Sequence, residues 1–306
     1  AYPAWSPHPP RPPIQPHNRC VMSPSMAHAR IAAERRHLVL PPRGTLIVNT
    51  DVHGNGEDFR AVRDHFLDAL ARDPAAHWVI LGDVVHAPDD RARRESPALY
   101  DYTDESGAIV REILALQERH PGRVHFVLGN HDYGHVGGLR TRKFHPDEVA
   151  HLESTLDDTS RAALRTLFGA ALLAVAAPCG VLLTHGSPDA TLDALADLDA
   201  ITLPPDPEND YHARALAVLL NCYGQPGEVS ARALAKLSTP EARLTVVIHG
   251  HDRDESGWFT EGGNQLCPVI FGAPRANKRY VCLDLAARYP DVHALRDGAE
   301  IRRVYG

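Results

Sequence analysis

The stretch that decides the fold is residues 45–55, Thr-Leu-Ile-Val-Asn-Thr-Asp-Val-His-Gly-Asn. Its first part is mostly apolar and predicts a buried strand at 45–50, while the polar residues and glycine that follow end this strand. Apolar residues then recur at helical spacing, at Phe59, Val62 and Phe66, which predicts an amphipathic helix at 56–72. A strand that ends in polar residues and leads into a helix is typical of an α/β protein.

The same pattern recurs twice downstream. A predicted strand at 78–81 ends in Gly82-Asp83. After a predicted helix at 104–119, a strand at 124–128 ends in the tetrapeptide Gly-Asn-His-Asp, residues 129–132. Strands that alternate with helices at this spacing predict a parallel α/β core.

The second half of the chain contains an apolar run, 167–184, that approaches the length of a membrane span. Because Pro178-Cys179-Gly180 interrupts it, two strands joined by a tight turn explain the run better. Further helices are expected across 147–168 and near 190–198, 211–221 and 228–238. The expected strands are 171–177, 181–184, 244–248, 267–272, 279–284 and 299–304.

The bulk composition is that of a soluble globular protein, with 306 residues, 43% hydrophobic and 23% charged. A formal net charge of −7 argues against nucleic acid as the main partner, and no segment predicts a membrane anchor. The five cysteines form no C-x-x-C pair, so we expect reduced thiols and a cytoplasmic protein. The proline-rich residues 1–35 are expected to form an arm, and residues 36–306 a single domain. Oligomeric state is not specified by the sequence.

Polar clusters follow five of the predicted strands. Besides the three given above, His185-Gly186 follows the strand at 181–184, and His249-Gly250-His251-Asp252 follows the strand at 244–248. The carboxyl edge of a parallel sheet is where α/β proteins place ligand sites, because the loops converge there. We therefore expect these clusters to form one site.

The residue types in these clusters favour a metal centre. Carboxylate, amide and imidazole groups without a thiol suit manganese, iron, zinc or magnesium. Asp51 and His53 point the same way on an extended chain and can share a metal, while a carboxylate such as Asp83 can bridge two metals. Two metals about 3.5–4 Å apart can clamp a phosphoryl group for displacement.

The motifs Asp51-x-His53-Gly54, Gly82-Asp83, Gly129-Asn130-His131-Asp132, His185-Gly186 and Gly250-His251 resemble those of the calcineurin-like metallophosphoesterases. The chain is most similar to the phosphoprotein phosphatase family of serine/threonine phosphatases, bacterial type. That narrower resemblance is carried by His185-Gly186-Ser187-Pro188, by Gly257-Trp258 after Gly250-His251, and by Val269-Ile-Phe-Gly-Ala-Pro274. It covers about residues 45–285.

The resemblance implies a metallophosphoesterase-type double β-sheet sandwich flanked by helices. It also implies a metal-dependent phosphomonoester hydrolase that uses a hydroxide bridging two divalent metals, with manganese preferred over iron, zinc or magnesium. Asp51 and His53 would hold one metal and Asp83 would bridge. Asn130, His185 and His251 would complete the second site. His131 would be the general acid that protonates the leaving oxygen.

The second motif departs from the family pattern, which continues Gly-Asp-x-x-Asp-Arg. Here His86 replaces the second aspartate, which orients the catalytic histidine, and Ala87 replaces the arginine that clamps phosphate. We therefore expect His86 or Asp132 to support His131. For the phosphate clamp, Arg275 is the leading candidate, because it follows the Gly272–Pro274 loop. The alternatives are Arg140, Arg142 and Arg214.

Several residues near the motifs have less specific roles. We expect a helix cap at Asn55, a solvated loop at His135 and at 89–95, and a ligand role for His251 rather than His249. The favoured substrate is a phosphoserine or phosphothreonine side chain, by resemblance only. The alternatives are a nucleotide or dinucleoside polyphosphate hydrolase, a phosphodiesterase, and a non-catalytic scaffold that binds partners through the proline-rich arm.

Overall fold

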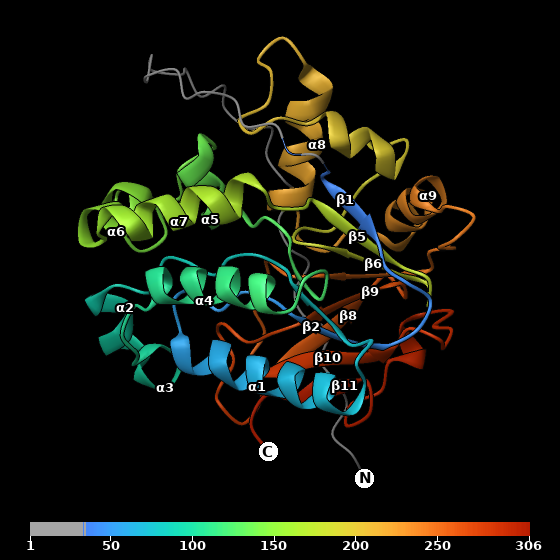
Figure 1. The fold of residues 1–306 in the computed structure, drawn as a ribbon, viewed down its shortest axis with the longest axis horizontal. Coiled ribbons are helices and arrows are strands. Elements are labelled where there is room, and N and C mark those ends of the chain that lie inside the picture. The colour runs from blue at the N-terminus through green and yellow to red at the C-terminus, as the bar shows by residue number, and fades with distance from the viewer. Residues whose placement is uncertain (1–32, 34) are drawn as a thin grey trace.

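The computed structural model describes residue 33 and residues 35–306, so the arm predicted at 1–35 lies almost wholly outside the described residues. Two β-sheets pack face to face, with helices on their outer surfaces (Figure 1). The five-stranded sheet has the order β11 (Ile301–Arg303), β10 (Arg279–Asp284), β2 (Thr45–Asn49), β3 (His77–Ile80) and β4 (Val124–Phe126). The six-stranded sheet has the order β1 (His37–Val39), β5 (Ala174–Ala177), β6 (Val181–Thr184), β7 (Val246–His249), β9 (Gln265–Pro268) and β8 (Trp258–Glu261). The predicted double-sheet sandwich is confirmed.

Alternating side chains build the core from each strand. In β2, Leu46 and Val48 point into the layer between the two sheets, whereas Ile47 points toward the outer helices. In β3, Trp78 points outward and is fully buried, with Phe59 and Phe66 each 5.5 Å from it between ring centroids. The parallel strands β2 and β3 are therefore buried on both faces, which explains their mostly apolar sequences, whereas β4 at the edge of the sheet carries the half-buried His125.

Helices cover the outer face of each sheet. Helix α1 (Gly56–Arg72) contacts β2 and β3, α4 (Ser106–Arg119) contacts β4, and α9 (Gly227–Leu237) contacts β7. Asn55 caps α1, as predicted, because its side chain accepts the Asp58 N–H at 3.1 Å. The other helices are α2 (Asp90–Glu95), α3 (Pro97–Tyr100), α5 (Asn130–Tyr133), α6 (Glu148–Thr155), α7 (Asp158–Gly169), α8 (Asp210–Asn221) and the 3-10 helices η1 (Gly134–Val136), η2 (Leu195–Ala200) and η3 (Val292–Ala294).

Some predicted elements were wrong in type or extent. The helices expected across 147–168 are confirmed as α6 and α7, which are separate because Asp157 caps a new helix. The segment 190–198 contains a 3-10 helix, and the charged run 89–95 forms α2 instead of a loop. The strand expected at 267–272 is the shorter β9, because Phe271 leaves the sheet and its N–H donates to Asp51 O at 3.2 Å. Strands β1 and β8 were not predicted.

The carboxyl ends of strands from both sheets meet at one edge. The Val52 N–H donates to Asp83 O at 3.1 Å, and the Gly250 N–H donates to His185 O at 2.8 Å. These bonds tie the loop after β2 to the loop after β3, and the loop after β7 to the loop after β6. The two sheets thus bring five polar loops together.

The apolar run at 167–184 contains β5 and β6, which pair in antiparallel fashion across the predicted turn. Within the described chain, no helix is long and apolar enough to cross a membrane. Cys179, Cys222, Cys267 and Cys282 are free thiols, as predicted, and Cys20 lies outside the described residues.

Candidate metal centre and active site

Four of the five polar loops line a pocket of about 460 Å³, which is the size of a small-molecule site, and His185 of the fifth loop lies 3.6 Å from Asp83 behind it. Carboxylates and an amide come from the loops of the five-stranded sheet, and imidazoles come from the loops of both sheets. The structure thereby brings together all the predicted metal ligands: Asp51, His53, Asp83, Asn130, His185 and His251.

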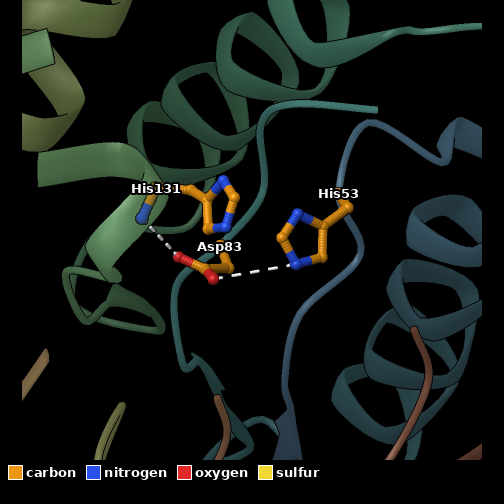
Figure 2. A group of neighbouring side chains, drawn as sticks. All are labelled: His53, Asp83 and His131. Atoms are coloured by element: carbon orange, nitrogen blue, oxygen red, sulfur yellow. Dashed lines mark hydrogen bonds and ion pairs between the residues drawn. The ribbon is translucent and has the colours of Figure 1, made fainter. Parts of the chain in front are cut away.

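Asp83 belongs to two groups of potential ligands, one with His53 and His131 (Figure 2) and one with His185 and His251. Its Oδ2 atom lies 3.7 Å from Nε2 of His53 and 3.6 Å from Nε2 of His185. Its Oδ1 atom accepts the backbone N–H of His131 at 2.9 Å, which holds the carboxylate in place. A carboxylate that faces two imidazoles in this way has the position that a bridging metal ligand requires.

The imidazoles of His53 and His185 are oriented by backbone carbonyls. Nδ1 of His53 lies 3.1 Å from Val85 O, and Nδ1 of His185 lies 2.7 Å from Leu81 O. Because a carbonyl oxygen only accepts, each Nδ1 carries the proton and each Nε2 presents a lone pair to the pocket. Metal-binding histidines are commonly oriented by such contacts.

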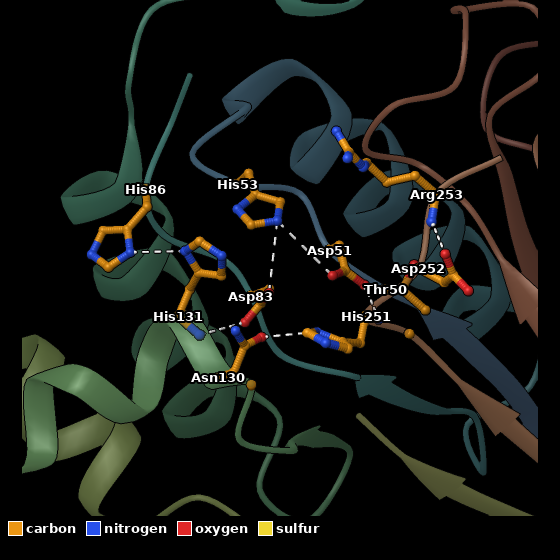
Figure 3. A network of polar contacts seen from close by, with 12 residues as sticks. Thr50, Asp51, His53, Asp83, His86, Asn130, His131, His251, Asp252 and Arg253 are labelled. Atoms are coloured by element: carbon orange, nitrogen blue, oxygen red, sulfur yellow. Dashed lines mark hydrogen bonds and ion pairs between the residues drawn. The ribbon is translucent and has the colours of Figure 1, made fainter. Parts of the chain in front are cut away.

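The remaining ligand candidates surround Asn130 and Asp51 (Figure 3). The Oδ1 atom of Asn130 lies 3.1 Å from Nε2 of His185 and 3.0 Å from Nδ1 of His251. Asp51 places Oδ1 at 4.0 Å from Nε2 of His53, and its Oδ2 accepts the backbone N–H of His251 at 3.1 Å. Two sets of oxygen and nitrogen donors therefore converge around Asp83.

The electrostatics of these carboxylates call for cations. Burial raises the pKa of Asp51, and burial together with the nearby charge of Asp51 raises the pKa of Asp83 well above its ordinary value. Two desolvated carboxylates side by side stay ionised only if positive charge compensates them. Divalent ions would supply that charge, and the oxygen and imidazole donors fit them.

Backbone strain is concentrated at this site. Among the described residues, positive φ angles at non-glycine positions occur at His53 (43°), Asp83 (50°), His86 (69°) and His251 (65°). A left-handed conformation costs an L-residue about 1–2 kcal/mol. Since strain of this kind persists where function requires it, its confinement to these loops supports a functional role for all four residues.

Glycines in the motifs allow the carboxylates to approach closely. A Cβ atom on Gly129 would lie 2.3 Å from Oδ1 of Asp83, and one on Gly250 would lie 2.5 Å from Oδ2 of Asp51. Neither distance leaves room for a side chain. The glycine beside each polar residue is therefore part of the site.

His131 lies next to Asp83, with one ring nitrogen facing away from the centre. Its Nδ1 lies 3.1 Å from Nδ1 of His86, 3.2 Å from Oγ1 of Thr141 and 3.5 Å from Oε2 of Glu148. The other ring nitrogen lies on the side of His53 (Figure 3). Burial, followed by the charge of His53, lowers the pKa of the His131 imidazole well below its ordinary value.

Of the two residues expected to support the His131 ring, His86 lies within hydrogen-bond distance of it, whereas the Asp132 carboxylate bonds to backbone groups. Its Oδ2 accepts the backbone N–H groups of Asp83 (2.7 Å) and Gly129 (3.0 Å), and its Oδ1 accepts that of Val84 (3.1 Å). Because its carboxylate is occupied by these bonds, Asp132 holds the second and third motif loops together.

Of two other histidines, His135 differs from expectation and His249 agrees with it. His135 is buried in η1 rather than solvated, and its Nε2 lies 3.0 Å from Nε2 of His86. His249 is fully buried at the end of β7, with Nδ1 2.9 Å from Gly250 O, and it does not line the pocket. The choice of His251 over His249 as the ligand candidate therefore agrees with the geometry.

Arg275 lies outside the pocket, so its expected role as the phosphate clamp is corrected. Its guanidinium pairs with Glu57 at 2.7 Å and stacks on the Tyr305 ring at 3.5 Å from the centroid. Of the alternatives, Arg140 pairs with Asp147 at 2.6 Å, and Arg214 lies on α8, where its Nε donates to Asp210 O at 3.3 Å. Only Arg142 of the predicted arginines lines the pocket.

Sequence reasoning missed other residues on the pocket wall. Lys143 and Arg253 line it, and Nζ of Lys143 lies 4.7 Å above the Phe271 ring. Tyr223 stacks on the His251 ring, with centroids 4.8 Å apart, and is 51% exposed. Lys143 and Tyr223 lie in loops with no motif, whereas Arg253 is the second residue after His251, a position that fits the phosphoprotein phosphatase pattern.

Comparisons with known proteins agree with this geometry. Residues 44–253 match the family model of the calcineurin-like phosphoesterases. A solved protein serine/threonine phosphatase from Saccharomyces cerevisiae, with similarity to human phosphatase PP5, is 14% identical with a TM-score of 0.53, covering 83% of this chain and 77% of that chain. A likeness at that identity supports the fold alone.

Two further structures have lower TM-scores. A cold-active protein-tyrosine phosphatase from a psychrophilic Shewanella species has a TM-score of 0.43 at 11% identity, covering 83% of this chain and 79% of that chain. A metallophosphoesterase from Sphaerobacter thermophilus has a TM-score of 0.40 at 15% identity, covering 80% and 85%. No curated protein matches the chain in sequence. Since the family model spans more than half of the sequence and its motifs meet in one pocket, the chain belongs to the calcineurin-like phosphoesterase family.

Proposed function

We propose that this phosphoesterase hydrolyses phosphomonoesters at a centre of two divalent metal ions, with manganese as the preferred metal. The observation that carries the proposal is the position of Asp83, whose Oδ2 lies 3.7 Å from one imidazole and 3.6 Å from another. Asp51 and His53 would hold the first ion. Asn130, His185 and His251 would hold the second. We also propose that residues 36–306 form one domain, because both sheets contribute to this centre.

Two bound ions would supply Lewis-acid charge and activate water as the nucleophile. The residues of the chain supply the rest. The pocket-facing nitrogen of His131 donates a proton to the leaving oxygen, while its Nδ1 stays bound to His86 at 3.1 Å. Asp132 keeps the loops that carry Asp83 and Asn130 in register.

Positive side chains on the pocket wall would bind the phosphate oxygens. Lys143, Arg142 and Arg253 line the pocket, whereas Arg275 does not. Charge that develops on a transferring phosphoryl group is stabilised by fixed cations of this kind. Lys143 is the strongest candidate, because the Phe271 and Phe144 rings hold its ammonium group, 4.7 Å and 5.3 Å from their centroids.

The favoured substrate is a phosphoserine or phosphothreonine side chain. The support is the resemblance of the last motifs to serine/threonine phosphatases, including Arg253 at the position two residues after His251. A second candidate is a nucleotide or dinucleoside polyphosphate. Tyr223 supports this alternative, because the residue is half exposed and lines the pocket, where an aromatic ring can stack on a base.

The test compares four substrates with the manganese-loaded protein and an Asp83→Asn variant. We expect turnover of p-nitrophenyl phosphate but not of bis-p-nitrophenyl phosphate, and faster turnover of a phosphoserine peptide than of a dinucleoside tetraphosphate. Asp83→Asn should abolish each activity that the wild type shows. Preference for the dinucleotide favours the second candidate. No activity with any of them, together with no bound metal, would leave only a non-catalytic scaffold.

A further inference from the structure

A row of hydrogen-bonded side chains leads from His131 to the protein surface. Nδ1 of His131 lies 3.1 Å from Nδ1 of His86, and Nε2 of His86 lies 3.0 Å from Nε2 of His135. Nδ1 of His135 then lies 3.0 Å from Oε1 of Glu153 on α6. The three imidazoles are buried, while the Glu153 side chain is 35% exposed. This row therefore begins at the buried His131 in the active site and ends at the carboxylate of Glu153 on the surface.

The carboxylate at the outer end sets the direction of every hydrogen bond. The hydrogen bond from His135 lowers the pKa of Glu153, so its carboxylate is ionised and can only accept. Nδ1 of His135 must then carry the proton, which leaves a lone pair on its Nε2. In neutral rings, the same logic makes Nε2 of His86 the donor to His135. Nδ1 of His86 is then the acceptor, and Nδ1 of His131 carries a proton.

This direction is the one that a general acid at His131 needs. With a proton fixed on Nδ1, any second proton is on the nitrogen that faces the pocket. The positive ring that results is stabilised by a chain of aligned dipoles ending in a carboxylate. His86, the middle member, has a left-handed backbone conformation, with φ 69°, which costs about 1–2 kcal/mol.

We propose that His135 and Glu153 are positioning residues that act through His86 to hold the Nδ1 proton of His131 and to aim its other nitrogen at the leaving oxygen. This proposal rests on the proposed function of His131. The supporting carboxylate is that of Glu153 on α6, and the imidazoles of His86 and His135 lie between it and His131.

Glu148 is the competing carboxylate. Its Oε2 lies 3.5 Å from Nδ1 of His131, which is beyond the usual range of a hydrogen bond, and its Oε1 accepts the Phe144 N–H at 3.0 Å. His86 is closer, at 3.1 Å, and makes a second contact at 3.0 Å to His135. The geometry therefore favours support of His131 by His86 over support by Glu148. A Glu148→Gln variant distinguishes these two possibilities.

The test uses substitutions that separate hydrogen bonding from packing. His135→Phe keeps a ring against Phe168, whose centroid lies 5.8 Å away, but removes both ring nitrogens. His135→Gln can still accept from His86 and donate to Glu153. Glu153→Gln removes only the charge, and Glu118→Gln, on an exposed face of α4, is the matched control. The metal content of each variant is measured, so that loss of metal is not mistaken for loss of the acid.

The readout is how strongly turnover depends on the leaving group. A p-nitrophenolate leaves without a proton, whereas the alkoxide of phosphoserine requires one. We expect His135→Phe to lower kcat for a phosphoserine peptide about tenfold and Glu153→Gln about fivefold, which is a fraction of the roughly 10²–10⁴-fold that general acid catalysis contributes. KM, and kcat for p-nitrophenyl phosphate, should stay within about twofold, and His135→Gln should retain most of the peptide activity.

An equal fall for both esters, or no change for either, would overturn the proposal. So would a leaving-group effect in Glu148→Gln that is absent in His135→Phe. His131→Asn distinguishes this failure from that of the proposed function. If His131→Asn shows the leaving-group effect and His135→Phe does not, only the positioning role is wrong. If His131→Asn shows none, His131 is not the acid, and the positioning role falls with it.

Discussion

Replacing Lys143 by alanine tests how the enzyme binds phosphate. At 4 Å, two unit charges interact by about 1 kcal/mol in water and about 4 kcal/mol at an effective dielectric constant of 20. The Lys143 ammonium lies on the pocket wall above Phe271, but the residue remains partly exposed to solvent. We therefore expect an intermediate loss of about 2 kcal/mol of transition-state stabilisation, which is about thirtyfold in kcat/KM.

The assay is steady-state hydrolysis of p-nitrophenyl phosphate by the manganese-loaded protein. Lys143→Arg should recover most of the activity, because it keeps the charge. Lys236→Ala is the matched control, since Lys236 pairs with Asp193 at 2.7 Å on α9, outside the pocket lining. Arg275→Ala should change kcat/KM less than twofold, because Glu57 and Tyr305 hold that guanidinium outside the pocket. A tenfold loss in Arg275→Ala, with less than a threefold loss in Lys143→Ala, would refute this reasoning.

Three other substitutions test the fold around the site. Gly129→Ala would place a Cβ atom 2.3 Å from Oδ1 of Asp83, so we expect it to lower the free energy of unfolding by about 1–3 kcal/mol in a urea titration. Trp78→Ala should lower the free energy of unfolding by about 3–5 kcal/mol, because the fully buried indole packs between apolar rings. A smaller loss would mean that neighbouring side chains move in to fill the cavity. Burial lowers the pKa of both His77 and His125 to about 4 from 6.5. Between pH 4 and pH 6.5 the unfolded chain therefore binds more protons than the folded protein. The free energy of unfolding should fall as the pH drops from 6.5 to 4. His125→Gln should weaken this dependence, and an unchanged slope would show that His125 does not contribute.

The parts of the fold that were predictable are those whose apolar period is unambiguous. Strands β2 and β3 and helix α1 were predicted within a residue or two, because their buried faces repeat at regular spacing. Strand β8 was missed, because its side chains are half-buried or exposed and show no alternation. Strand β9 ends early because Phe271 turns toward Asp51, a long-range contact that local sequence does not encode.

The candidate site also has a part that could be predicted from the sequence and a part that could not. The metal-ligand candidates follow strand ends in motifs, so their convergence could be predicted from the sequence. The surroundings of His131 could not, because His135 and Glu153 come from η1 and α6 and meet His86 only through tertiary packing. Arg275 was misassigned because adjacency to a loop in sequence does not set the direction of a long side chain, which here pairs with Glu57.

The central claim is that one carboxylate joins two metal sites, and metal stoichiometry tests it most directly. The purified protein is loaded with manganese, freed of excess ion by gel filtration and analysed by mass spectrometry for metal per chain, beside Asp83→Asn. We predict two ions per chain in the wild type and at most one in the variant, since Asp83 lies 3.7 Å and 3.6 Å from imidazoles of the two sites. A single ion in the wild type, or two ions in the variant, would contradict a centre bridged by Asp83.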